Sequence, residues 1–272
     1  MHYSRHSLPL GQDSIAYIDQ GQGPVLVCLH AIGHSADDYT GFIQSVNRRF
    51  RCIAVDFPGH GASSKGTRPV SSAYYADLVQ ALLNQLDIHH CILIGNSIGG
   101  ATAIELAARQ PDKVRALVLC NPGGIFERNL VTRIASPVFA TLFAQGEKGV
   151  RWYKPFYSTF YRVVLTRTTA RTRRDEIIEQ AYETAQVCRE AWQSFGTPES
   201  DLRNMVRNLD MPILVAWAQQ DRINRLKLNL PTIKGLRNGL LKTYRAGHIA
   251  FLECPEEFMR DFDAFVAGGE LR

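Results

Sequence analysis

The sequence has no stretch of about 18 uninterrupted apolar residues, and its first ten residues carry no apolar segment of the kind that directs secretion. We therefore expect no membrane-spanning helix and a cytoplasmic location. The six cysteines form no Cys-x-x-Cys pair, and no cysteine–histidine spacing typical of a metal site occurs. We expect reduced thiols, no metal site and no cofactor.

Internal repeats and low-complexity tracts are also absent, and the 272 residues are 45% hydrophobic and 21% charged. These values are ordinary for a globular protein, so disorder, collagen and coiled coil are excluded. A chain of this length can bury most of the surface that its unfolded form exposes. The net charge of +5 is modest, but the positive charges are concentrated in one segment.

Five short runs are almost continuously apolar, without alternation between apolar and polar residues. Strands with this pattern are covered on both faces, as in a mainly parallel sheet flanked by helices. Helix-like segments at 72–86 and 99–109 lie between them, which predicts a doubly wound α/β fold with a mostly parallel sheet. The runs are Val25–Leu29, Cys52–Val55, Cys91–Ile94, Ala116–Cys120 and Ile213–Trp217.

The N-terminal segment predicts a hairpin. Residues 3–8 and 14–19 alternate in part between apolar and polar side chains, and Gly11-Gln12-Asp13 separates them. This pattern favours two antiparallel strands at the edge of the sheet.

The interval between Cys120 and Ile213 predicts an insertion. It spans about 90 residues, far more than one crossover between parallel strands needs. Apolar residues between Arg171 and Phe195 recur every three or four positions, so we expect one amphipathic helix there. We predict a helical cap after the sixth strand, with residues 123–205 as the cap and residues 1–122 and 206–272 as the core.

A candidate nucleophile follows the third of these runs. Gly95-Asn96-Ser97-Ile98-Gly99 matches G-x-S-x-G between a strand and a helix-like segment. A serine in such a strained turn needs neighbours without bulky side chains, and Gly95 and Gly99 meet that need. The N–H groups at the start of the following helix point toward developing negative charge. We predict Ser97 as the nucleophile; a glycine-rich turn with a bystander serine is the alternative.

With these residues the chain resembles the α/β-hydrolase family over about residues 20–265, apart from the cap. Leu29-His30-Ala31-Ile32-Gly33 stands where that family carries its oxyanion loop, with Ala31 where glycine is usual. The resemblance implies that the backbone N–H groups of Ile32 and Ile98 form an oxyanion hole. It also implies that the turn at 56–63, which contains His60, is structural.

The same resemblance implies the other two catalytic residues. His248 lies in a Gly-His segment followed by Glu253 and Pro255, similar to the family's loop after the last strand, and would act as general base. Asp221 follows the run at 213–217, where the family keeps its acid. Some relatives carry the acid after the preceding strand, where this chain has Asn121, which cannot hold a negative charge. The order Ser97, Asp221, His248 is the one expected of this fold.

These motifs predict a serine hydrolase that cleaves an ester or thioester through an acyl-enzyme and uses no cofactor. A serine nucleophile disfavours the dehalogenase and epoxide-hydrolase versions of the fold. A second resemblance, at Gly95–Ala103 and Asn121–Gly124, is to the hydrolases that break C–C bonds in meta-cleavage products. A ligand receptor and a cofactor-independent oxygenase that uses the His–Asp pair stay open as alternatives on the same scaffold.

The substrate and partners depend on the cap. Residues 128–174 hold ten Lys or Arg against one acid, Glu147, together with eight aromatic residues. Three interpretations stay open: a solvated basic face over an aromatic pocket, an acidic partner or carboxylate-bearing substrate, and contact with an anionic membrane surface. The acidic partner includes an acyl group carried on an acidic protein. No nucleic-acid-binding motif accompanies the charge, so we expect no nucleic-acid partner.

Overall fold

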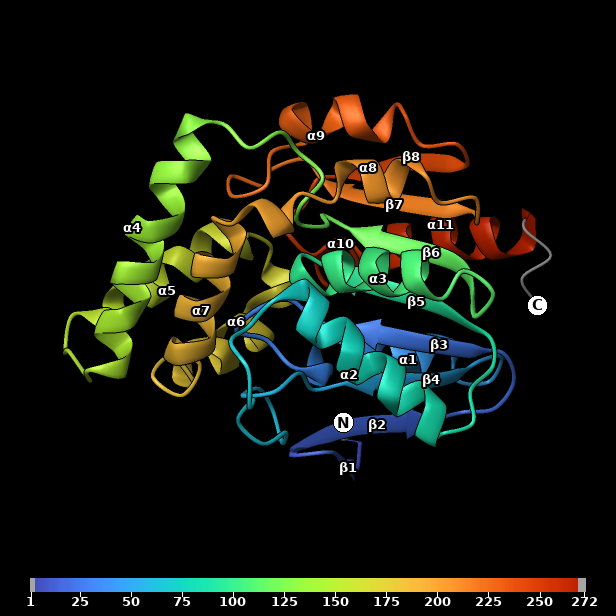
Figure 1. Ribbon diagram of the computed structural model, residues 1–272, viewed down its shortest axis with the longest axis horizontal. Coiled ribbons are helices and arrows are strands. Elements are labelled where there is room, and N and C mark those ends of the chain that lie inside the picture. Colours follow the sequence, from blue (N-terminus) through green and yellow to red (C-terminus); the bar gives the residue numbers. More distant parts are fainter. Residues whose placement is uncertain (1–2, 269–272) are drawn as a thin grey trace.

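The computed structural model of the protein describes residues 3–268, in which eight strands form one sheet with helices on both faces (Figure 1). The order across the sheet is β1-β2-β4-β3-β5-β6-β7-β8. From β4 to β8 all neighbours run parallel, which confirms the doubly wound, mostly parallel α/β fold. The strands are β1 (His6–Leu10), β2 (Asp13–Gln20), β3 (Val25–Leu29), β4 (Arg51–Val55), β5 (Cys91–Asn96), β6 (Val114–Cys120), β7 (Ile213–Ala218) and β8 (Gly239–Tyr244).

The apolar runs are explained by burial on both faces of the sheet. In β3, Leu26 and Cys28 belong to one core cluster, whereas Val27 and Leu29 belong to a second cluster on the other face. The first cluster includes side chains of α1 (Thr40–Val46), α10 (Ala250–Glu253) and α11 (Pro255–Gly268). The second includes those of α2 (Ser72–Gln85), α3 (Ile98–Arg109), α8 (Arg203–Arg207) and α9 (Leu226–Ile233).

The edges of the sheet differ in how well the sequence predicts them. The N-terminal hairpin is confirmed, since β1 and β2 pair antiparallel with Leu10 opposite Asp13. Its first strand begins at His6, three residues later than predicted, and β2 continues to Gln20 to pair with β4. Strand β8 has no continuous apolar run because it forms the opposite, half-exposed edge.

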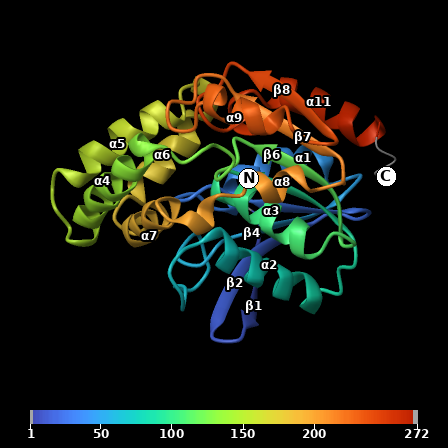
Figure 2. The same cartoon turned by 45° about the horizontal axis from the view of Figure 1, so that its top comes forward.

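A helical insertion lies between β6 and β7, as predicted; the first four of its five α-helices lie together beyond the carboxyl ends of the parallel strands, and the fifth is α8 (Figures 1 and 2). The single helix predicted for residues 171–195 is wrong, because the chain turns at 180–184 and leaves Tyr182 38% exposed. The turn lets the first half pack on one cap helix and the second half on another. The four helices are α4 (Leu130–Glu147), α5 (Tyr153–Val164), α6 (Arg171–Glu179) and α7 (Ala185–Phe195).

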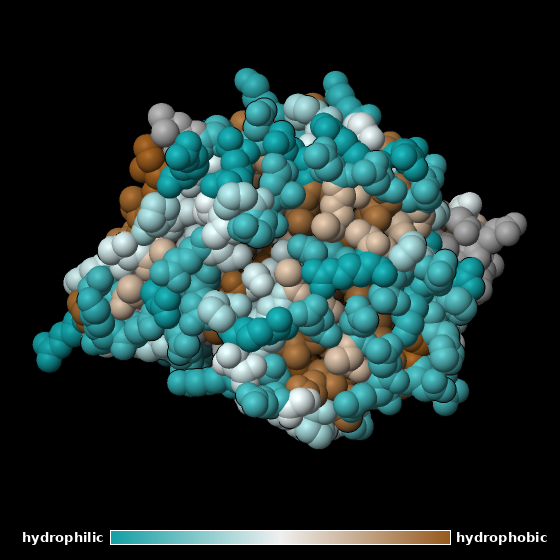
Figure 3. Space-filling view, in the orientation of Figure 1, coloured by the Kyte–Doolittle hydropathy of each residue, from teal (hydrophilic) through white to brown (hydrophobic). Residues whose placement is uncertain are grey.

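The predicted division into core and cap stays a prediction, since its boundary at 205–206 falls inside α8. Among the described residues, no helix is long and apolar enough to cross a membrane. The outer side of α4 nevertheless exposes Ile134 and Val138 by 57% and 51%, and Figure 3 shows a hydrophobic area on that side. Contact of the cap with an anionic membrane surface stays a prediction.

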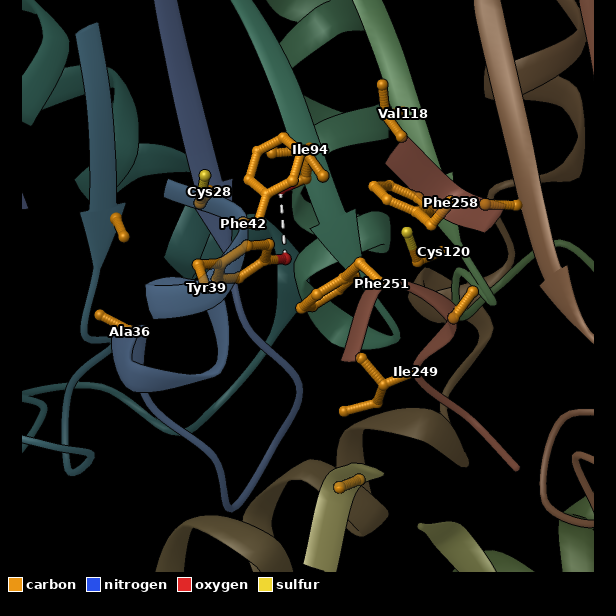
Figure 4. Packing of buried hydrophobic residues seen from close by; sticks show 14 of the residues in the cluster. Cys28, Ala36, Tyr39, Phe42, Ile94, Val118, Cys120, Ile249, Phe251 and Phe258 are labelled. Carbon is orange, nitrogen blue, oxygen red and sulfur yellow. Dashed lines mark hydrogen bonds between the residues drawn. The ribbon is translucent and has the colours of Figure 1, made fainter. Parts of the chain in front are cut away.

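An aromatic stack joins the loops that follow β3 and β8 (Figure 4). Tyr39, in the 3-10 helix η1 (Ala36–Tyr39), stacks on Phe251 of α10 with ring centroids 4.5 Å apart. The Tyr39 hydroxyl donates a hydrogen bond of 2.8 Å to the carbonyl of Leu29 at the end of β3. Both rings are buried, so the two loops share one apolar base.

Truncation of the Phe251 side chain should lower the stability of the fold. Phe251→Ala should lower the free energy of unfolding by about 3–5 kcal/mol, because it leaves a cavity beneath Tyr39 and Phe258. Urea denaturation followed by circular dichroism measures the loss. Leu240→Ala, at a side chain that is 43% exposed, is the control and should cost far less. Equal costs for the two variants would contradict the packing described.

Candidate active site

The turn at Ser97 is strained and is built from glycine. Ser97 has φ 54° and ψ −115°, a combination that L-residues avoid, and it lies between β5 and α3. A Cβ on Gly95 would lie 2.3 Å from the Gly99 carbonyl oxygen, and one on Gly99 would lie 2.1 Å from the Leu29 carbonyl oxygen. The two glycines of the motif are therefore required by close backbone contacts.

The peptide unit that carries the Ile32 N–H is held through its own carbonyl. That carbonyl, on Ala31, accepts hydrogen bonds from His30 Nδ1 (2.6 Å) and from the His34 N–H (3.2 Å). His30 Nε2 accepts from the Phe57 N–H, so its hydrogen is on Nδ1. Burial lowers the pKa of His30 well below its ordinary value, so the ring is neutral.

The next peptide unit, between Ile32 and Gly33, is fixed at both ends. The Gly33 N–H donates to His60 Nε2 at 3.0 Å, and the Ile32 carbonyl accepts from the Tyr161 hydroxyl of α5 at 3.2 Å. Burial lowers the pKa of His60 to about 4, so the ring is neutral and can accept. The His60 turn thus supports the loop. Within residues 3–268, neither the Ile32 N–H nor the Ile98 N–H has an acceptor, so both donors are available.

His248 and Asp221 form a buried pair, with His248 Nδ1 2.6 Å from Asp221 Oδ2. Asp221 also accepts from the Asn121 side-chain amide at 2.7 Å and from the N–H groups of Ile223 and Asn224, each at 2.8 Å. These donors fix the carboxylate in one orientation. The structure therefore brings Asp221 and His248 together as predicted, and it gives Asn121 a supporting position.

The charge of His248 responds to two opposing effects. Burial lowers its pKa, but the neighbouring Asp221 carboxylate, through charge and hydrogen bond, and the more distant Glu253 raise it above the ordinary value. Asp221 accepts from Nδ1, so in the neutral ring the lone pair is on Nε2. The arrangement presents a basic nitrogen whose affinity for a proton is increased.

Glu253 organises the loop that carries His248. Its Oε2 accepts from the N–H groups of Gly247 (2.8 Å), His248 (3.0 Å) and Ile249 (3.3 Å). Its Oε1 accepts from the N–H groups of Thr166 (2.8 Å) and Arg167 (3.0 Å), which follow α5. One buried carboxylate thus holds both the histidine loop and the end of a cap helix.

Ser97, His248 and Ile32 line one cavity of about 540 Å³ between the cap and the carboxyl ends of the strands. No hydrogen bond joins the Ser97 side chain to the His248 ring among the described residues, and such contacts often tighten only when substrate binds. The cavity wall is mostly apolar, with the cap contributing the aromatic residues Phe139, Phe143, Phe160, Tyr161, Trp192 and Phe195.

The polar part of the wall is electropositive. Arg128, Arg222 and Arg225 line the cavity, and no Asp or Glu is among the described residues that do. None of the three guanidinium groups lies in a salt bridge within residues 3–268, and Arg128 Nε is buried without an acceptor there. In the same part of the chain, no three His, Cys, Asp or Glu side chains gather to hold a metal ion. The site can offer a hydroxyl, a base, two N–H donors and cationic groups.

Comparison with known proteins identifies the family. The model of the α/β-hydrolase fold family matches residues 24–255. The chain belongs to this family. A solved structure of an α/β-hydrolase-like fold, described as a hydrolase from Pseudomonas aeruginosa, superposes with a TM-score of 0.81 at 21% identity over 96% of this chain and 98% of that one, a likeness of fold alone.

Two α/β-hydrolase relatives match most of the chain. A 2-hydroxy-6-oxo-6-phenylhexa-2,4-dienoate hydrolase of Comamonas testosteroni is 26% identical over 90% of this chain and 88% of its own. A pimeloyl-[acyl-carrier protein] methyl ester esterase of Nitrosomonas europaea is 28% identical over 90% and 96%. A Mycobacterium bovis protein is 37% identical over 117 residues, a stretch that is 43% of this chain and 34% of that protein. The matched stretch thus spans about a third of that relative.

Several residues that support the site have no assigned role in the sequence analysis. Glu253 follows His248 by five residues, and this spacing is the one signal that the sequence offers for its role. Asn121 cannot replace the acid, but its side-chain amide donates a hydrogen bond to the Asp221 carboxylate. Tyr161 reaches the oxyanion loop from 129 positions away, which no local pattern reveals.

The His248–Asp221 pair predicts an NMR result. The pKa of His248 should lie above the ordinary histidine value of about 6.5, and Asp221→Asn should lower it, because the substitution removes the negative charge that stabilises the imidazolium. Titration of the ring resonances measures both values. Asp263→Asn, which removes a carboxylate paired with Arg49 on the surface, is the control and should leave the titration unchanged. Equal values in wild type and Asp221→Asn would contradict the assignment.

Proposed function

We propose that this α/β-hydrolase is a serine hydrolase that cleaves an ester or thioester of a carboxylate-bearing small molecule. The observation that carries the proposal is the position of Ser97. It occupies a strained turn at the start of α3 and shares a cavity with His248, whose ring Asp221 holds at 2.6 Å. A strained backbone that presents one side chain between a strand and a helix is typical of a nucleophile turn.

The proposed cycle uses the groups already described. His248 Nε2 takes the Ser97 proton as Oγ bonds to the acyl carbon, and the carbonyl electrons move onto oxygen, where the Ile32 and Ile98 N–H groups stabilise them. The tetrahedral intermediate collapses, and the leaving alcohol or thiol takes the proton from His248. A water molecule then gives a proton to His248 and attacks the acyl carbon; the C–Oγ bond breaks, the acid leaves, and His248 returns the proton to Ser97 Oγ.

The charge of the cavity supports the choice of substrate class. Its wall holds Arg128, Arg222 and Arg225, no Asp or Glu is among the described residues that line it, and the rest of the wall is mostly apolar. A negative group on the substrate would supply that balance, and an apolar body would fill the aromatic part. The free substrate or one carried on an acidic protein presents the same chemistry to this wall.

A second candidate is the hydrolysis of a C–C bond in a meta-cleavage product. The same electropositive wall fits the carboxylate of a dienoate, and a dienoate hydrolase is among the relatives that match most of the chain. Hydrolysis of 2-hydroxy-6-oxo-6-phenylhexa-2,4-dienoate without hydrolysis of p-nitrophenyl esters would favour this candidate over the esterase.

The nucleophile is tested by one substitution. Ser97→Ala should lower kcat for p-nitrophenyl butyrate by about 10⁶-fold, because the acyl-enzyme cannot form. Ser136→Ala removes a hydroxyl from another part of the cavity wall and is the matched control. Circular dichroism verifies that both variants fold. Hydrolysis by Ser97→Ala at the wild-type rate would refute the proposal.

The electropositive wall is tested by a pair of substrates. Arg225→Gln should raise KM for the p-nitrophenyl monoester of glutaric acid by about fivefold, because an exposed ion pair contributes about 1 kcal/mol. KM for the uncharged butyrate ester should change little. Because Arg225 is exposed, added salt should weaken the wild-type preference for the charged ester. Arg237→Gln, at an exposed residue that pairs with Asp210 and is not among the residues lining the cavity, is the control. Equal effects on both esters would contradict an anion-binding role.

A further inference from the structure

A second histidine–carboxylate pair faces the cavity from the loop after β3. His34 Nδ1 lies 2.7 Å from Asp38 Oδ2, and both side chains are almost completely buried. The backbone N–H of His34 donates to Ala31, so the residue lies in the same turn as the Ile32 N–H. His34 lines the cavity together with Ser97 and His248. The proposed cycle gives this pair no role.

The carboxylate of this pair is neutralised from the cap. Arg173 of α6 donates from Nε to Asp38 Oδ1 at 2.7 Å and from a terminal nitrogen to Ser35 Oγ at 2.9 Å. Burial alone raises the pKa of Asp38, but His34 and Arg173 outweigh it and hold that pKa well below its usual range. Asp38 therefore stays ionised with a cation on one side and the imidazole on the other.

The carboxylates that pair with the two cavity histidines, Asp221 and Asp38, differ in their other partners. Asp221 is surrounded by neutral amide donors and is free to stabilise an imidazolium at His248. Asp38 instead has a cationic partner, since Arg173 Nε lies 2.7 Å from Asp38 Oδ1 on the side away from His34 Nδ1.

The contact with Asp38 leaves one ring nitrogen of His34 for a ligand. Asp38 accepts from Nδ1–H, so the Nε2 lone pair is the remaining hydrogen-bonding position. Within residues 3–268, no hydrogen bond to Nε2 is formed, although the nearby ring of Tyr161, with its centroid 5.4 Å away, packs beside it. Because His34 lines the cavity, a bound molecule can supply a donor to this ring position.

The order of the strands places this acceptor on a different side of Ser97 from the arginines. The His34 loop follows β3, Ser97 follows β5, and Arg222 and Arg225 follow β7. The sheet order β3-β5-β6-β7 therefore puts Ser97 between them, and three strand spacings amount to roughly 14 Å. One part of a substrate that reacts at Ser97 can reach the arginines while another reaches His34.

We propose that His34, held by Asp38 and Arg173, is a specificity-determining residue that accepts a hydrogen bond from a hydroxyl group of the substrate. This inference rests on the proposed function only in placing the substrate in this cavity. The substrate class is then a hydroxylated ester rather than a simple alkanoate. The role requires the acceptor at Nε2 and not merely a side chain of that volume.

The test compares matched esters in matched variants. The substrates are p-nitrophenyl hexanoate and its 2-, 3- and 6-hydroxy derivatives, and the readout is the ratio of kcat/KM for each hydroxy ester to that for hexanoate. In wild type, at least one ratio should exceed the others by about tenfold, since one hydrogen bond contributes about that factor. His34→Phe should abolish this preference, because it keeps an aromatic ring and removes the acceptor.

His34→Gln should restore much of the preference, because its side-chain amide oxygen reaches near the position of Nε2. His89→Phe, the same substitution at a surface histidine whose side chain is 73% exposed, is the control and should keep the wild-type ratios. A preference that survives in His34→Phe, or wild-type ratios that do not differ among the hydroxy esters, would overturn the proposal.

A binding measurement separates this proposal from the proposed hydrolysis. The Ser97→Ala protein is titrated with methyl hexanoate and the three methyl hydroxyhexanoates, and NMR shifts report the Kd of each. One hydroxy ester should bind about tenfold more tightly than hexanoate, and the added His34→Phe substitution should remove the difference. Binding without that difference refutes the role of His34. Absence of Ser97-dependent turnover with the difference present refutes the hydrolase and not the binding role.

Discussion

The contact between the start of α3 and the end of β3 is the constraint on which the site depends. Only a glycine at position 99 allows the helix to approach the Leu29 carbonyl so closely, and only a glycine at position 95 lets the chain turn back beneath it. The approach places the Ile98 N–H beside the loop that carries the Ile32 N–H. It also forces Ser97 into its strained backbone. The positions of Ser97, the proposed nucleophile, and of both N–H donors are therefore consequences of one backbone contact.

The rest of the site geometry is fixed by residues that position other groups, through hydrogen bonds to the loops of the site. His30 and His60 are neutral because they are buried, and as neutral rings each can donate from one nitrogen and accept at the other. Two successive peptide units of the oxyanion loop are thereby fixed. On the other side of the cavity, Asn121 and Glu253 hold the acid and the histidine loop through hydrogen bonds to main-chain and side-chain groups. Preorganised donors of this kind need no rearrangement when charge develops.

The sequence predicts what local chemistry determines. Strands buried on both faces are continuous apolar runs, so the sequence predicts the parallel sheet. A strained strand–helix turn needs glycine on each side of the serine, so the sequence also predicts the position of Ser97. The histidine and the acid follow from their order along the chain and from the family resemblance. Strand β8 cannot be predicted in this way, because a half-exposed edge strand has no continuous run of apolar residues. The break between α6 and α7 depends on contacts with α5 and α4, and the periodicity through Tyr182 gives no sign of it.

The six hydrogen bonds that Glu253 accepts have a mechanical consequence for the cap. Three of them hold the segment after α5, and Tyr161 and Arg173 attach α5 and α6 to the oxyanion loop and to Asp38. Lifting this half of the cap would break these bonds and loosen the histidine loop at the same time. The position of α5 and α6 is therefore coupled to that of the histidine loop through a single buried carboxylate.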